Sequence, residues 1–165
     1  MLFLIAFISL ATPIESMVQH RIDVTHSRVT PAQAVRIAHA VEKYSAEYNV
    51  PPEIIVGIIE RESTFSPIVV SKRGCVGLMQ LSPTTAQVVA KELGIIYYNL
   101  KNVEHNIRLG TKYLASLYAI YKDWDTAMAA YNMGPGKLKK MGVKRTQYSR
   151  DVRKNIRAQK HRVNN

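Results

Sequence analysis

Apolar residues recur along most of the chain at the three- and four-residue spacing of helices, and no two neighbouring segments alternate as paired strands would. Between residues 102 and 121, for example, Val103, Ile107, Leu114 and Leu117 recur at helical spacing. The pattern therefore predicts an all-α globular domain with little or no β-structure. The expected helices cover about residues 31–48, 52–62, 83–93, 102–121, 125–133 and 147–160.

Capping residues mark where several of these helices begin and end. The dipeptides Thr30-Pro31 and Ser82-Pro83 each place an N-cap hydroxyl before a proline, which suits the first helical turn. Gly94 provides a C-terminal glycine for one helix, and the Gly-Pro-Gly of 134–136 stops another. The stretch from 63 to 77 contains a proline and two glycines, so it predicts a loop.

One predicted helix carries a glutamate among isoleucines. At about 100° per residue, one face consists of Ile54, Ile58, Glu62, Ile55 and Ile59. Glu53 and Glu60 project from the opposite side and are expected to be ordinary solvated charges. Burial of a lone carboxyl raises its pKa, which is how an enzyme obtains a general acid that keeps its proton near neutrality. The alternative is that Glu62 marks the helix end and turns outward to a Lys or Arg.

The first sixteen residues form an apolar segment that we set apart from the fold. Leu2 to Ala11 is apolar except for Ser9, which suits the central region of a signal peptide and is short for a membrane span. The segment has no Lys or Arg before this run, unlike most signal peptides. Residues 1–16 therefore predict export, to the periplasm or outside the cell, with an uncleaved anchor or a buried helix as alternatives.

Charge is concentrated at the C-terminus. The net charge is +11, and residues 137–162 hold eleven basic side chains and one acid, whereas residues 1–136 are nearly neutral. A basic segment of this kind suits nucleic acid, an anionic membrane or an acidic wall polymer, or it is a solvated helix end with no dedicated partner. The single cysteine and five scattered histidines show no metal-ligand spacing, so we assign no metal and no cofactor.

Four motifs follow one another along the chain. They are Glu62-Ser63-x-Phe65-x-Pro67, Gly77-Leu78-Met79-Gln80-Leu81, Asn106-Ile107-x-x-Gly110-x-x-Tyr113-Leu114, and Ala129-Ala130-Tyr131-Asn132 before Gly-Pro-Gly. In this order and spacing the chain resembles the catalytic domain of soluble lytic transglycosylases, lysozyme-like enzymes that cut peptidoglycan glycan strands. The resemblance places a catalytic domain at about residues 30–155, after the segment 1–16 and before a basic tail at 156–165.

The resemblance also implies roles for individual residues. Glu62 would be the catalytic acid, Tyr131 would hydrogen-bond its carboxyl, and Asn132 would hold the N-acetyl group of the substrate. Tyr148 resembles the tyrosine of a closing motif that returns to the active site. Further expected substrate-site residues are Ser63, Gly77, Met79 and Gln80. Gly77 permits close backbone approach, and the Gln80 amide can both donate and accept hydrogen bonds. The alternative interpretation is a polar residue at a helix end for Ser63 and a core side chain for Met79.

Three positions depart from the family pattern. Val70 and Cys75 stand where the family usually has alanine, and Met133 follows the Tyr-Asn pair in place of another alanine. We expect Cys75 to be a small buried apolar residue. Met133 is expected to narrow or line one sugar subsite.

The spacing of acids favours a lyase over a hydrolase. Ordinary glycoside hydrolysis uses two carboxylates, and goose-type lysozymes, which resemble this chain, carry acids between the catalytic glutamate and the Gly-Leu-Met-Gln motif. Residues 63–76 contain no Asp or Glu. The alternatives are a hydrolytic muramidase or a non-catalytic module that binds wall polymer or another polyanion. We expect a monomer that acts on glycan strands and does not bind nucleic acid, in a setting such as secretion, conjugation, pilus assembly, phage entry or wall turnover.

Overall fold

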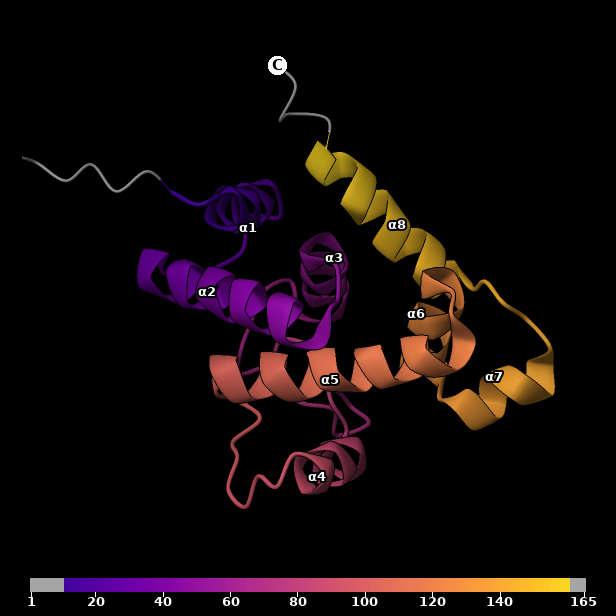
Figure 1. Cartoon of the computed structure of the whole chain (residues 1–165). Coiled ribbons are helices and arrows are strands. Elements are labelled where there is room, and N and C mark those ends of the chain that lie inside the picture. Colours follow the sequence, from indigo (N-terminus) through magenta and orange to yellow (C-terminus); the bar gives the residue numbers. More distant parts are fainter. Residues whose placement is uncertain (1–10, 161–165) are drawn as a thin grey trace, which may run out of the picture.

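The computed structural model describes residues 11–160, whose regular structure is almost entirely helical (Figure 1). The only β-structure in this range is two isolated bridges, which join Val76 to Val70 and to Leu81. The all-α expectation is therefore confirmed. The helices are α1 (Pro13–Val24), α2 (Pro31–Tyr48), α3 (Pro52–Ser63), α4 (Pro83–Glu92), α5 (Val103–Tyr121), α6 (Trp124–Met133), α7 (Pro135–Met141) and α8 (Gln147–Lys160).

The sequence signals for helix ends are found where we expected them. The Thr30 and Ser82 hydroxyls accept the N–H groups of the third helical residues of α2 and α4. Asp123 caps α6 in the same way. α7 was not predicted, although Pro135 after Gly134 provides an ordinary first-turn proline.

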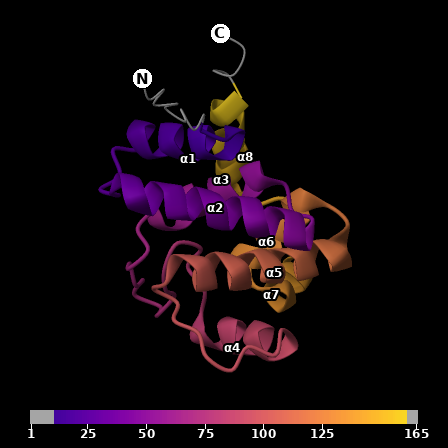
Figure 2. The same ribbon diagram turned by 60° about the vertical axis from the view of Figure 1, so that its left-hand side comes forward.

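α1 is a second helix that the sequence analysis did not predict. Residues 1–10 of the expected export segment lie outside the described residues, but Thr12 caps α1 through a capping box with Glu15. Val18 and Ile22 of this helix are buried, and α1 lies against α2 in both views (Figures 1 and 2). The segment from 13 to 16 is therefore part of the packed domain.

The helices form a layered stack, in which α1, α2, α5 and α4 follow one another from top to bottom (Figure 2). α8 packs along α3, and Gly57 permits this approach because a side chain there would touch Val152 and Ile156. Ile156 and Gln159 are buried, so residues 156–160 continue α8 and do not form a separate tail. No described helix is long and apolar enough to span a membrane.

Two hydrophobic clusters divide the interior. The larger one joins α1, α2, α3, α5, α6 and α8, and a smaller one lies between α4 and α5 and includes Leu81, Val89 and Leu109. Tyr113 and Tyr131 are half-buried and pack against both clusters. The candidate site lies at the boundary between the two clusters.

Candidate active site

Glu62 lies in the last turn of α3, where the chain reverses sharply. Thr64 and Phe65 both adopt positive φ angles, of 50° and 62°, and the Phe65 side chain is fully buried. The five isoleucine and valine side chains of α3 before Glu62 are also buried. The apolar stripe predicted from the sequence is therefore confirmed, and it leads directly to a half-buried carboxyl.

The surroundings of Glu62 favour its protonated form. Burial raises the pKa of the carboxyl, and this effect outweighs the opposing influence of the Tyr148 hydroxyl and the Arg61 guanidinium. Arg61 is itself held 3.4 Å from Asp151 and lies over the Tyr148 ring. A carboxyl with this raised pKa can carry a proton to a substrate at a pH where a solvated glutamate has already lost it.

Glu62 opens into a polar cleft of about 380 Å³ between the two hydrophobic clusters. Among the described residues that line the cleft, Glu62 is the one carboxylic acid and Arg73 is the one strong base. Of the expected site residues, the cleft also receives Gln80, Tyr131 and Asn132. Met133 lines it too, as we expected from its departure from the family pattern.

Tyr131 differs from the role that the resemblance implied, whereas Tyr148 lies near Glu62. The Tyr131 hydroxyl donates to the Met79 carbonyl at 2.8 Å rather than to Glu62, and its ring packs at 5.4 Å against that of Tyr113. The Tyr148 hydroxyl is buried and makes no hydrogen bond of good geometry with a described residue. It nevertheless lies close enough to Glu62 for each group to shift the pKa of the other.

Burial, and then the nearby Glu62 charge, raise the pKa of both Tyr131 and Tyr148 well above its usual value. Both hydroxyls therefore stay protonated and can act as donors. α8 brings Tyr148 to Glu62 along the seam that also buries Val152 and Ile156 against α3.

Ser63 and Met79 face away from the cleft. The Ser63 hydroxyl donates to the Ile59 carbonyl one turn earlier in α3, at 3.0 Å, which matches the alternative reading of a polar helix end. Met79 is fully buried, and its side chain lies against Gly110. Met79 contributes to the site only through its backbone carbonyl, which accepts the hydrogen bond from the Tyr131 hydroxyl.

Gly77 and Gln80 shape the loop between α3 and α4. Gly77 has φ of +80°, and a side chain there would collide with the Leu100 carbonyl and with Asn106, so these are the groups that approach its backbone closely. The Gln80 amide donates to the carbonyls of Val69 and Gly77, at 3.2 and 2.9 Å. Its amide oxygen remains available toward the cleft.

Asn106 organises this loop, although the sequence analysis quoted it only as part of a motif. Its side chain accepts the Met79 N–H at 2.8 Å and donates to the carbonyls of Val76 and Leu100, at 2.9 and 2.8 Å. It is buried, so each of these bonds replaces one with water. Asn106 therefore fixes the loop that carries Gln80.

Several cleft residues were not predicted as site residues. Cys75 is half-exposed at the cleft, which corrects the expectation of a buried apolar residue. Arg73 had no recognisable signal because single basic residues in loops are common. The others are Ser71, Leu81, Ser82, Thr85, Tyr113 and Gly134.

No cluster of three potential metal ligands occurs in the described part of the chain.

The fold of this chain, an all-helical domain with one half-buried carboxyl at the cleft between two hydrophobic clusters, is lysozyme-like. Within that class the chain belongs to the Transglycosylase SLT domain family, whose model matches residues 39–156. A structure of an inactive mutant of the lytic transglycosylase Slt from Pseudomonas aeruginosa superimposes with a TM-score of 0.68 and 24% identity, and covers 76% of this chain and 24% of that one.

Sequence relatives agree with the family. A transglycosylase of Enterobacteria phage PRD1 is 37% identical over 112 residues, which are 68% of this chain and 40% of the phage protein. An endo-type membrane-bound lytic murein transglycosylase A of Klebsiella pneumoniae is 44% identical over 81 residues, which are 46% of this chain and 40% of that protein. The chain thus spans less than half the length of these relatives.

Proposed function

We propose that the protein is a peptidoglycan lytic transglycosylase that cleaves the β-1,4 bond between N-acetylmuramic acid and N-acetylglucosamine without water. The observation that carries this proposal is the single carboxyl of the cleft. Hydrolysis by the usual route needs two carboxylates on either side of the bond. Glu62 has no such partner among the described residues of the cleft.

One carboxyl can complete the reaction if the substrate supplies the nucleophile. Protonated Glu62 gives its proton to the glycosidic oxygen as the bond to C1 of muramic acid breaks. The resulting carboxylate accepts the proton of the C6 hydroxyl of the same sugar, and O6 bonds to C1. Glu62 is protonated again, and the product is a 1,6-anhydromuramoyl end. A nucleophile within the same sugar gains the proximity advantage of an intramolecular reaction.

The surrounding residues support both halves of this cycle. The Tyr148 hydroxyl lies near Glu62 and stabilises the carboxylate after it has given up its proton, as the lowering effect on the Glu62 pKa indicates. The exposed Asn132 and the free amide oxygen of Gln80 suit the N-acetyl groups of the glycan. Arg73 offers a guanidinium to the carboxylates of the peptide stems.

Related proteins support the same assignment. The Pseudomonas aeruginosa Slt structure is that of an inactive mutant with glutamine in place of one glutamate. The Klebsiella pneumoniae relative is named as a membrane-bound murein enzyme. We infer in addition that this chain is exported to the wall, through the apolar run Leu2 to Ala11 that precedes α1. Secretion, conjugation and pilus assembly, which need local wall opening, remain compatible settings.

The test is digestion of purified sacculi followed by mass spectrometry. The wild type should release anhydromuramoyl ends, which are lighter by one water than reducing ends. Glu62→Gln should lose on the order of 10²–10⁴ in rate, the usual contribution of general acid–base catalysis. Glu53→Gln, on the same helix, is the matched control and should keep wild-type activity.

Two results would contradict the proposal. Reducing muramic ends from the wild type would make the enzyme a hydrolytic muramidase. Equal activity of Glu62→Gln and Glu53→Gln would remove Glu62 from catalysis altogether.

A further inference from the structure

Two cavities on the C-terminal third of the chain adjoin each other outside the catalytic cleft. The first, of about 660 Å³, lies along α8 and is lined mainly by arginines and a lysine. The second, of about 1080 Å³, lies between the end of α5 and α7 and is lined mainly by apolar groups. Arg145 lines both cavities, so the two adjoin at this residue, and together we call them the C-terminal face.

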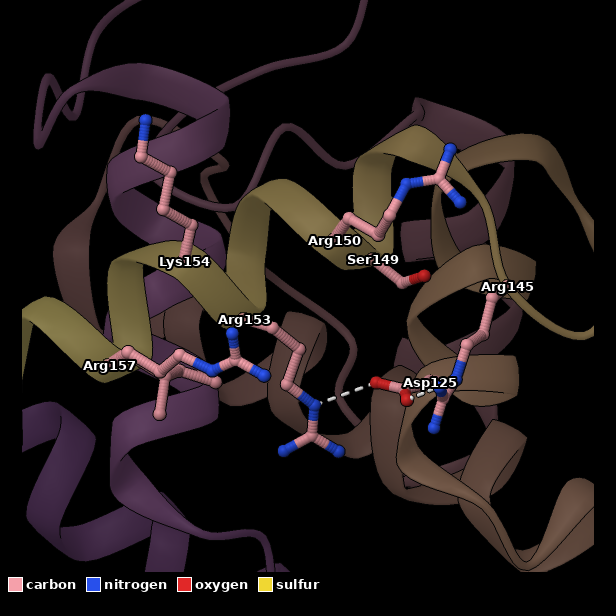
Figure 3. Close-up of a pocket in the computed structure, with 8 residues that line it drawn as sticks. Asp125, Arg145, Ser149, Arg150, Arg153, Lys154 and Arg157 are labelled. Carbon is pink, nitrogen blue, oxygen red and sulfur yellow. Dashed lines mark hydrogen bonds and ion pairs between the residues drawn. The ribbon is translucent and has the colours of Figure 1, made fainter.

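A buried acid fixes two arginines of the basic cavity. Asp125 lies at the start of α6 with its side chain 9% exposed, and its two oxygens accept from the Nε atoms of Arg145 and Arg153, each at 2.7 Å (Figure 3). Asp125 therefore has a different role from its neighbour Asp123, which caps α6. Because each guanidinium uses Nε for Asp125, its terminal N–H groups remain free for another anion.

A stripe of cations continues along α8. Arg150, Lys154 and Arg157 recur at helical spacing on one side of the helix, and all three are exposed. Figure 3 shows Arg150 and Lys154 projecting away from Asp125. No carboxylate of a described residue lies within ion-pair distance of these three side chains, and Arg150 is bonded only to the neutral Gln147. Their charge is therefore available to a partner.

Apolar side chains are exposed around the second cavity, whose lining also includes two lysines and Arg145. Ile120 is 68% exposed and Val143 is 36% exposed, and both line the second cavity. Met141, in the last turn of α7, is 52% exposed between Lys140 and the glycine that ends the helix. An exposed apolar group gains nothing from a solvated sugar or phosphate polymer, but it gains free energy by entering the acyl boundary of a bilayer.

We propose that the C-terminal face binds anionic phospholipids at a membrane surface. The cations of α8 and the loop before it would bind the phosphate groups, because guanidinium forms charge-assisted hydrogen bonds with phosphate oxygens. Ile120, Met141 and Val143 would enter the interfacial layer. Single-stranded nucleic acid would instead gain from aromatic platforms for its bases, and the one tyrosine of α8 is buried at Glu62.

The placement of this surface leaves the enzyme free to work. The residues that line the two cavities are different from those that line the catalytic cleft. The same helix α8 presents Tyr148 to Glu62 and Arg150 to the C-terminal face. Membrane contact at the C-terminal face therefore uses none of the residues that line the cleft.

The experiment is co-sedimentation of the full-length protein with phosphatidylcholine vesicles, with and without phosphatidylglycerol. The charge variant is Arg150→Gln, Lys154→Gln and Arg157→Gln together. Its control removes three exposed cations elsewhere, through Arg28→Gln, Arg36→Gln and Lys101→Gln. The apolar variant combines Ile120→Ser with Val143→Ser. All proteins retain residues 1–16, so any contribution of that segment is common to them.

We expect the wild type to bind vesicles that contain phosphatidylglycerol and to bind pure phosphatidylcholine weakly. Each cation near an anionic bilayer contributes roughly a factor of five to partitioning, so the charge variant should lose on the order of 100-fold. The control triple should keep most of the binding. The apolar variant should bind the vesicles several-fold less well while retaining its affinity for heparin, a soluble polyanion.

Two outcomes would overturn the proposal. Equal losses in the charge variant and its control would mean that only net charge attracts the protein. Unchanged vesicle binding by the apolar variant, together with full competition by heparin, would mean that the surface is a site for soluble polyanions. Because these measurements involve no catalysis, they stand or fall separately from the lytic activity.

Discussion

Glu60 gives the sharpest test of how α3 is held in place. The sequence predicts a solvated charge at this position, but the structure places it against α1. Its carboxylate accepts from Nε and the terminal nitrogen of Arg21 at 2.7 and 2.5 Å, and the two side chains are only 9% and 6% exposed. This ion pair therefore joins α1 to the helix that carries Glu62.

Replacement of Glu60 by glutamine should destabilise the protein without abolishing catalysis. Removal of one partner leaves the Arg21 charge buried, which typically costs about 3–5 kcal/mol. Glutamine retains one acceptor oxygen, so we expect the lower end, about 3 kcal/mol. In a domain of this size that corresponds to a fall of about 6–12 °C in the melting temperature.

The measurement is urea denaturation followed by circular dichroism, with Glu53→Gln as control. Glu53 lies in the first turn of the same helix and forms no ion pair with a described residue. The double variant Arg21→Met with Glu60→Leu should recover most of the loss, because it removes both charges. An unfolding midpoint of Glu60→Gln equal to that of the control would refute the reasoning, as would a double variant less stable than Glu60→Gln.

Three further predictions concern the site. The pKa of Glu62 in the folded protein is raised above its ordinary value of 4.5. The free energy of unfolding should therefore fall as the pH rises from 4.5 through the folded pKa, because the buried carboxyl then becomes charged. Glu62→Gln should therefore be more stable than the wild type at pH 7 and no more stable below pH about 4 in denaturation at several pH values. Tyr148→Phe removes a group that lowers the Glu62 pKa, so the basic limb of kcat/KM should move to higher pH, and a limb at unchanged pH would mean that the hydroxyl does not act on the carboxyl. Gly77→Ala should prevent folding or destabilise the protein by several kcal/mol, because its methyl group meets the backbone carbonyl of Leu100 at a positive φ angle. The methyl group of Gly110→Ala meets the flexible Met79 side chain instead. Gly110→Ala should therefore lower the melting temperature less than Gly77→Ala.

The sequence by itself predicted six of the eight described helices and the acid that lies at the cleft. Spacing of apolar residues and N-cap hydroxyls located α2 to α6 and α8, because helix period and capping depend on neighbouring residues only. The same period placed Glu62 among buried isoleucines of one helix. The motif order then indicated Gln80, Tyr131 and Asn132, which do line the cleft.

Tertiary structure decided which groups meet across helices. Glu60 is nearly buried because Arg21 of α1 packs against it on the side of α3 opposite Glu62. Asp125 is paired because α8 brings Arg153 to it and the loop before α8 brings Arg145. Similarly, the hydroxyl of Tyr131 reaches Met79, 52 residues away, and Tyr148 is the tyrosine whose side chain approaches Glu62. A helical period fixes the direction of a side chain on its own helix, but the partner depends on how helices pack, and the packing is set by all buried side chains together.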